Sequence, residues 1–144
     1  MARLLEQDSA LLSARNERGK TPLHMAVTSG STPMVQWLLE HGSEVNAQDS
    51  TGLTPLHLAA WWTVTERAKV LLDSGANLEA RDAFGDTPLH MAAMHGRNAM
   101  VRLLIDRGAD ASVRNKDGRT PAELARTKRH EFTAQYIEGR IAVR

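Results

Sequence analysis

Apolar residues gather in short clusters at the spacing of helical turns, and two kinds of cluster alternate along the chain. Within residues 82–114, a first cluster of small and medium apolar side chains consists of Leu89, Ala92 and Ala93. A second, more apolar cluster consists of Met100, Val101, Leu103, Leu104 and Ile105. A glycine follows each cluster, at Gly96 and Gly108, where a left-handed backbone can end a helix. The pattern predicts a short first helix that a neighbour can approach closely, then a reversal and a second helix.

Polar residues mark the start of each predicted helix pair. Residues 82–85 place an aspartate first and a glycine last, which is typical of a tight turn. Thr87 can cap the following helix through its hydroxyl, and Pro88 suits the first helical position because its missing N–H needs no partner. The unit is therefore a turn, a helix, a reversal and a second helix.

The same unit recurs every 33 residues. The tetrapeptide Thr-Pro-Leu-His begins at Thr21, Thr54 and Thr87, and Thr-Pro-Ala-Glu begins at Thr120 in the same register. A glycine lies two residues before each of these threonines, so this is not a chance recurrence of one short word. One unit cannot bury its own apolar face, so the units must stack, which predicts an all-α solenoid.

The 33-residue period, the motif Asp-x-x-Gly-x-Thr-Pro-Leu-His-x-Ala-Ala and the motif Leu-Leu-x-x-Gly-Ala resemble the ankyrin repeat. The resemblance covers nearly the whole chain and implies a solenoid of stacked helix-turn-helix units with β-hairpin-like loops. We expect a single ankyrin-repeat domain over residues 1–144. It divides into a partial N-terminal repeat, three full repeats and a C-terminal capping repeat, at residues 1–15, 16–48, 49–81, 82–114 and 115–144.

Composition narrows the classes of function. The 144 residues are 42% hydrophobic and 24% charged and include no cysteine, which excludes a disulfide framework, a thiol nucleophile and a thiolate zinc site. The formal net charge of +1 is too small to indicate a polyanionic partner by itself. The sequence shows neither a membrane-spanning stretch nor the apolar run of a signal peptide. We therefore expect a soluble intracellular protein, in the cytoplasm or the nucleus.

Six histidines raise the question of a metal site. His24, His57 and His90 all take the fourth place of the tetrapeptide, where the resemblance implies hydrogen bonds to the capping threonine and the adjacent turn. The other three show no metal-ligand spacing. No nucleophile elbow, phosphate-binding loop or dinucleotide fingerprint occurs. We expect no enzyme activity, no cofactor, no metal and no small-molecule substrate.

The positions that vary between repeats carry the candidate site. In ankyrin-like units the partner faces a concave surface, which the hairpin tips and the first helices form. Three of the six aromatic side chains fall on that surface beside basic residues, an arrangement typical of protein interfaces. The predicted partner-binding residues are Trp61, Trp62, Phe84, Met94, His95, Leu53, Arg81, Asp86, Arg114 and Arg119.

The resemblance implies protein–protein recognition. Apolar side chains would anchor a partner protein or peptide, and Arg81, Arg114 and Arg119 would steer an acidic segment. Two alternatives stay open: self-association through the exposed patch, and nucleic-acid binding, which the small net charge disfavours. Trp61 and Trp62 could also fill space between repeats, since adjacent helical residues cannot both face one way.

Two further residues give structural expectations. Thr63 takes the place that Gly30 and Gly96 hold in neighbouring units. A β-branched residue is strained in left-handed backbone, so we expect a reshaped turn there. Trp37 lies beside two leucines in a predicted second helix, so we expect it in the core.

Overall fold

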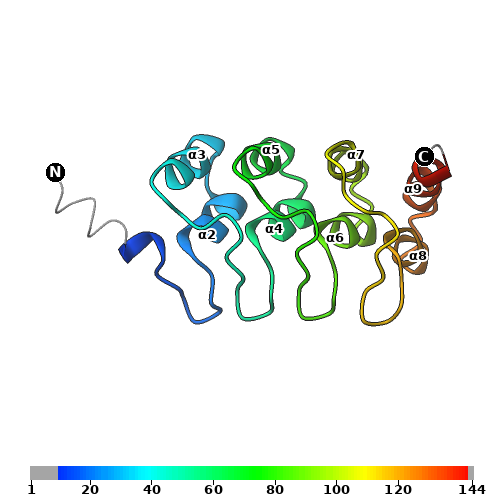
Figure 1. The fold of residues 1–144 in the computed structure, drawn as a ribbon, viewed down its shortest axis with the longest axis horizontal. Coiled ribbons are helices and arrows are strands. Elements are labelled where there is room, and N and C mark those ends of the chain that lie inside the picture. The colour runs from blue at the N-terminus through cyan, green and yellow to red at the C-terminus, as the bar shows by residue number, and fades with distance from the viewer. Residues whose placement is uncertain (1–9, 143–144) are drawn as a thin grey trace.

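The structure, a computed structural model, describes residues 10–142. From residue 22 onward its helices are α2 (Pro22–Ser29), α3 (Thr32–Glu40), α4 (Pro55–Trp62), α5 (Thr65–Asp73), α6 (Pro88–Met94), α7 (Asn98–Asp106), α8 (Pro121–Thr127) and α9 (Glu131–Ala142). The even-numbered helices form one layer and the odd-numbered helices the other, and long loops project from the first layer (Figure 1). The predicted all-α repeat solenoid is confirmed. No helix among the described residues is long and apolar enough to span a membrane.

Each first helix begins at a threonine–proline pair, where a reciprocal cap fixes its start. In α2 the Thr21 hydroxyl accepts the N–H of His24 at 3.4 Å, and His24 Nδ1 accepts the N–H of Thr21 at 3.1 Å. The same pair of bonds starts α4, α6 and α8, with glutamate in place of histidine in α8. These bonds satisfy donors that the first helical turn cannot pair internally. The repeated tetrapeptide therefore sets where each unit begins.

The capping histidines also tie each unit to the next. All three imidazoles have 0% exposure. Because Nδ1 accepts the threonine N–H, Nε2 carries the proton and donates to a carbonyl oxygen in the following loop. The distances from Nε2 of His24, His57 and His90 to the carbonyl oxygens of Leu53, Asp86 and Arg119 are 2.8, 2.8 and 2.9 Å. The structural role expected for these histidines is confirmed.

Burial of these imidazoles predicts a loss of stability on mild acidification. Desolvation lowers the pKa of His24, His57 and His90 below the ordinary 6.5, although each bond to a carbonyl opposes the shift. The histidines of the unfolded chain then bind protons more readily than those of the folded chain. The free energy of unfolding is therefore highest above pH 6.5, with respect to these histidines, and falls as the pH drops below it. Each histidine adds a slope of at most about 1.4 kcal/mol per pH unit. Urea unfolding from about pH 8 to about pH 5 measures this slope, and constant or rising stability toward the acid end would contradict it.

The predicted hairpin-like loops are tight turns that contain no strand within the described residues. In the loop before α4, the Asp49 N–H donates to the Leu53 carbonyl, and Asp49 Oδ1 accepts the N–H groups of Thr51 and Leu53, each bond being 2.9 Å long. Gly52 has φ +81°, and a Cβ there would lie 3.0 Å from Cα of Asp82 in the next loop. One backbone hydrogen bond joins each loop to the next. The stacked loops therefore make a continuous wall.

Small side chains set the spacing of the first helices. Ala59, Ala60, Ala92 and Ala93 have 0% exposure on α4 and α6, which pack against each other. Because these side chains are small, the two helices approach closely and their C-terminal ends lie side by side. This packing brings residues from adjacent units to one surface.

The turn after α4 differs from the prediction. Thr63 itself takes the left-handed conformation, with φ 57° and ψ 41°, so the expected reshaped turn is wrong. The Val64 N–H donates to the Ala59 carbonyl at 3.1 Å across the helix end, a bond that a left-handed residue permits. Among the three equivalent positions, Gly30 is the one that is not left-handed. Its backbone is extended, and Arg67 donates to its carbonyl at 2.7 Å.

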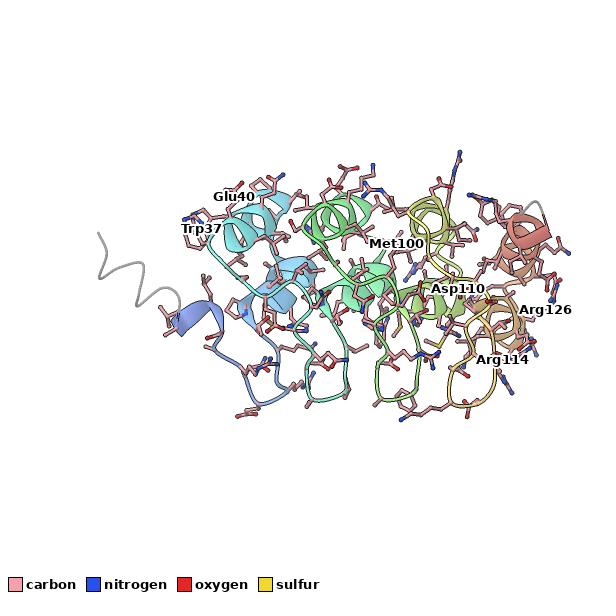
Figure 2. The ribbon with its side chains drawn as sticks, viewed as in Figure 1. Trp37, Glu40, Met100, Asp110, Arg114 and Arg126 are labelled. Carbon is pink, nitrogen blue, oxygen red and sulfur yellow. The ribbon has the colours of Figure 1, made fainter. Side chains whose placement is uncertain are left out.

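Trp37 is also placed differently from the prediction. Its side chain is 46% exposed on the outer side of α3 (Figure 2) and stacks on His41, with ring centroids 4.0 Å apart. Val35 and Leu38 take the buried positions of this helix. Successive helical residues point about 100° apart, so a tryptophan next to the buried Leu38 is turned away from the core. The expectation of a core Trp37 is wrong.

Candidate functional site

An open groove of about 550 Å³ lies between the stacked loops and the first helices. Side chains from α4, α6 and α8 line one side, and the loops before these helices line the other. The lining residues are Thr51, Leu53, Trp61, Asp82, Phe84, Asp86, Met91, Met94, Asn115, Asp117, Arg119, Leu124, Thr127 and Lys128. Three consecutive units therefore contribute to one surface.

Trp61, near the end of α4, is held in place by neighbouring rings. It is 36% exposed, and its ring stacks with those of Trp62 and His95 at centroid distances of 6.1 and 5.1 Å. Arg97 Nε donates to the Trp61 carbonyl at 3.1 Å. Burial lowers the pKa of His95, and nearby cationic side chains add to that shift, so the stacked imidazole is neutral near pH 7. Trp61 therefore lines the groove in a fixed orientation.

Phe84 and two methionines make the centre of the groove apolar. Phe84 lies in the loop before α6 and is 69% exposed. Met91 on α6 and Leu124 on α8 are only 4% and 8% exposed, and Met94 follows Met91 by one helical turn. Methionine side chains adapt to apolar ligands of varied shape. The exposed phenylalanine beside these residues leaves apolar surface in contact with water.

The loop wall beside Phe84 is acidic. Asp82 and Asp86 are 8% and 6% exposed, and Asp82 Oδ1 accepts the N–H groups of Phe84 and Asp86, both at 2.9 Å. Asn115 Nδ2, from the next loop, donates to Asp86 Oδ1 at 2.9 Å. Burial raises the pKa of Asp86 above its ordinary 3.8, the Asn115 bond opposes this, and the charge of Asp82 reinforces it. The groove therefore holds a carboxylate in a largely apolar setting.

Six of the ten residues predicted from the sequence line this groove: Leu53, Trp61, Phe84, Asp86, Met94 and Arg119. The lining does not include the other four, Trp62, His95, Arg81 and Arg114. Trp62 and His95 are close by, because both stack with Trp61. The structure thus brings the predicted apolar residues together more completely than the predicted basic ones.

The three arginines predicted to bind the partner, Arg81, Arg114 and Arg119, differ in their position relative to the groove. Arg114 donates to the Gly118 carbonyl at 2.6 Å and pairs with Glu123 at 3.2 Å, so its charge is already partly balanced. Arg81 is exposed, and its carbonyl accepts a bond from Gln48 at 3.0 Å. Of the three, only Arg119 is a lining residue.

Some lining residues are not predicted from the sequence. Met91 has a readable signal, because it lies three residues before Met94 and so on the same helical face. For Asp82 the sequence indicates a role in the turn and nothing more. The contact between Asp86 and Asn115 has no local signal, since it joins residues 29 positions apart in adjacent loops.

The described residues contain no group of three or more histidine, cysteine, aspartate or glutamate side chains that could hold a metal ion. The groove is open along its length between loops and helices, and its centre is apolar with a polar edge. The structure therefore places an open, largely apolar groove along one side of a repeat solenoid.

Comparison with protein-family models identifies the family. The model for ankyrin repeats (3 copies) matches residues 2–82 and 65–139, and this chain belongs to the ankyrin repeat family. The sequence matches none of the curated proteins with which it was compared. Ankyrin repeats are in general protein–protein interaction modules and are typically non-enzymatic. The division into repeats at 16–48, 49–81 and 82–114 stays a prediction.

Proposed function

We propose that the protein is a non-enzymatic interaction module that binds a segment of a partner protein in the groove lined by Trp61, Phe84 and Met94. The observation that carries this proposal is the apolar groove itself, with Phe84 69% exposed beside a rigid, partly exposed Trp61. Exposed apolar patches of this kind, edged by polar residues, mark binding surfaces. Tryptophan anchors at the centre of an interface often contribute most of its binding energy.

Rigidity of the groove supports tight binding. In the loop that carries Phe84, the N–H groups of Phe84 and Asp86 donate to Asp82 Oδ1, and the Asp86 carbonyl accepts from His57 Nε2. Trp61 is held by its two stacked neighbours. Because these groups are ordered before the partner arrives, less conformational entropy is lost on binding.

The proposal assigns a role to the basic residues that line the groove. Arg119 and Lys128 both line it, from the loop before α8 and from the end of that helix. In this proposal they attract an acidic part of the partner toward the C-terminal end of the groove. Arg81 and Arg114, outside the lining, would act at longer range.

The test is selection from random peptides displayed on phage, with wild type beside two double variants. Trp61→Ala/Phe84→Ala removes the groove anchors, and Trp37→Ala/Phe132→Ala removes an exposed tryptophan and phenylalanine that lie outside the groove lining. Phe84 and Phe132 are both 69% exposed, so the control loses a matched phenylalanine. We expect wild type and the control to enrich the same sequences and the groove variant to enrich none.

Equal enrichment by both double variants would contradict the proposed site. Sedimentation of wild type at several concentrations separates partner binding from self-association. A concentration-dependent dimer that Trp61→Ala/Phe84→Ala abolishes would assign the groove to a second copy of the chain. Circular dichroism of each variant checks that the helices remain folded.

A further inference from the structure

Asp86 is a buried carboxylate in the groove. Asp86 lines the groove and is only 6% exposed, although the equivalent places in the other units hold Lys20, Leu53 and Arg119, none of which is buried. Carboxylates are rarely buried unless they are paired. The local turn does not require an acid here, since a lysine, a leucine and an arginine serve in the same position.

Asp86 is held firmly, but one of its oxygens is unused. Its N–H donates to Asp82 Oδ1, its carbonyl accepts from His57, and Oδ1 accepts from Asn115. Oδ2 accepts no hydrogen bond from any residue that the structure describes. The side chain, which lines the groove, therefore keeps one carboxylate oxygen without a partner among these residues.

Asparagine at position 115 is compatible with a negatively charged Asp86. Asn115 Oδ1 accepts the N–H groups of Asp117 and Arg119, both at 3.0 Å, which is the role that the carboxylates of Asp49 and Asp82 have in their own turns. The amide leaves Nδ2 free to donate to Asp86. An aspartate at this position would set a second negative charge against Asp86.

An apolar segment alone would be a poor occupant of this groove. It would cover Asp86 and remove water from Oδ2, and an ion that is buried without a partner is strongly unfavourable. A cationic side chain would restore the lost solvation, and its guanidinium or ammonium donors match a carboxylate acceptor. The charge of Asp82 beside Asp86 favours a cation further.

The other charged groups of the groove restrict where that cation can lie. Asp82 and Asp117 are on the same loop wall, and Arg119 and Lys128 lie toward the C-terminal cap. The nearby imidazoles of His57 and His90 are buried, and burial lowers the pKa of both, so they are neutral near pH 7. A bound cation is therefore favoured on the Asp82 side of Asp86 and repelled from the side of Arg119.

We infer that Asp86 forms a polar subsite for a basic residue: the bound segment carries an arginine or lysine next to the apolar side chain that packs on Trp61 and Phe84. This inference rests on the proposed function. It adds a chemical rule for the partner, an apolar residue with a basic neighbour, and Asp86 is the residue that enforces this rule. Segments without the basic residue would be rejected because they leave the carboxylate unpaired.

The test repeats the phage selection with wild type, Asp86→Asn and Glu17→Gln. Asparagine at 86 removes the charge and keeps an oxygen for Asn115, so folding should be retained, which urea unfolding checks. Glu17→Gln removes a carboxylate charge from an exposed position in the loop before α2, outside the groove lining. We expect arginine or lysine at a fixed position in the peptides from wild type and from Glu17→Gln, and loss of that preference in Asp86→Asn.

A second measurement uses the best wild-type peptide and a copy in which citrulline replaces its arginine, or norleucine its lysine. Asp86→Asn should weaken binding of the charged peptide at least about tenfold and leave the neutral peptide nearly unchanged. Groove-dependent peptides without a fixed basic residue, or equal losses for both peptides, would overturn this inference and leave the proposed function intact. Failure of wild type to enrich any peptide that Trp61→Ala/Phe84→Ala loses would overturn both.

Discussion

Replacement of His57 by alanine is expected to lower the free energy of unfolding by about 3–5 kcal/mol. His57 has 0% exposure, its Nδ1 lies 3.1 Å from the Thr54 nitrogen and 2.8 Å from the Thr54 hydroxyl, and its Nε2 lies 2.8 Å from the Asp86 carbonyl oxygen. Alanine would leave the Thr54 N–H and the Asp86 carbonyl buried without these partners, at about 1–3 kcal/mol each. It would also leave a cavity between adjacent units.

Glu123→Ala is the matched control for this prediction. Glu123 fills the same place in the last capping box, where its Oε2 accepts the Thr120 N–H at 3.0 Å, but the side chain is exposed. Water can replace that bond, so the expected loss is only about 1 kcal/mol. Urea unfolding followed by far-ultraviolet circular dichroism measures both variants. Similar losses would show that burial of His57 is not the source of its effect.

The same bond links stability to the groove. His57 fixes the carbonyl of Asp86, and the adjacent Phe84 N–H is held by Asp82 in the same turn. The loop that supplies the apolar and acidic groups of the groove is therefore anchored from the helix of the preceding unit. Its geometry is therefore supported by contacts within the repeat array.

The fold could be predicted because its signals are local and repeated. A threonine cap, a proline and a turn glycine each act within a few residues, and four copies in register remove the ambiguity of one copy. Thr63 shows where this reasoning fails. The sequence indicates strain in a left-handed threonine, but the bond from Val64 to Ala59 closes the helix in that conformation despite the strain.

The apolar part of the site was more predictable than its charges. Trp61, Phe84 and Met94 follow from repeat positions that face the groove whatever their neighbours are. The charge of a position depends on contacts between units. Arg114 is paired with Glu123 and Asp86 with Asn115, and the sequence separation of the two residues predicts neither pair. One sequence therefore predicts which apolar residues line the groove, but it does not predict which of the charged residues are already paired.

Trp61→Ala is expected to weaken binding of a groove-selected peptide roughly 30- to 1,000-fold, which corresponds to about 2–4 kcal/mol. Trp61 is 36% exposed, so it can contact a ligand, and the parallel rings of Trp62 and His95 already restrict its motion. A large aromatic side chain that is ordered in advance gains contact area and loses little entropy on binding. Fluorescence anisotropy of the labelled peptide gives the affinities.

Two comparisons separate an anchor from a merely structural tryptophan. Trp37→Ala removes an exposed tryptophan from the outer side of α3 and should leave affinity unchanged (Figure 2). Trp62→Ala removes a side chain that is 57% exposed but outside the groove lining, so its effect should be smaller than that of Trp61→Ala. If Trp61→Ala retained full affinity with its helices intact, Trp61 would only fill space between units. If Trp62→Ala had the larger effect, the partner would bind over the ends of α4 and α6 instead of along the groove.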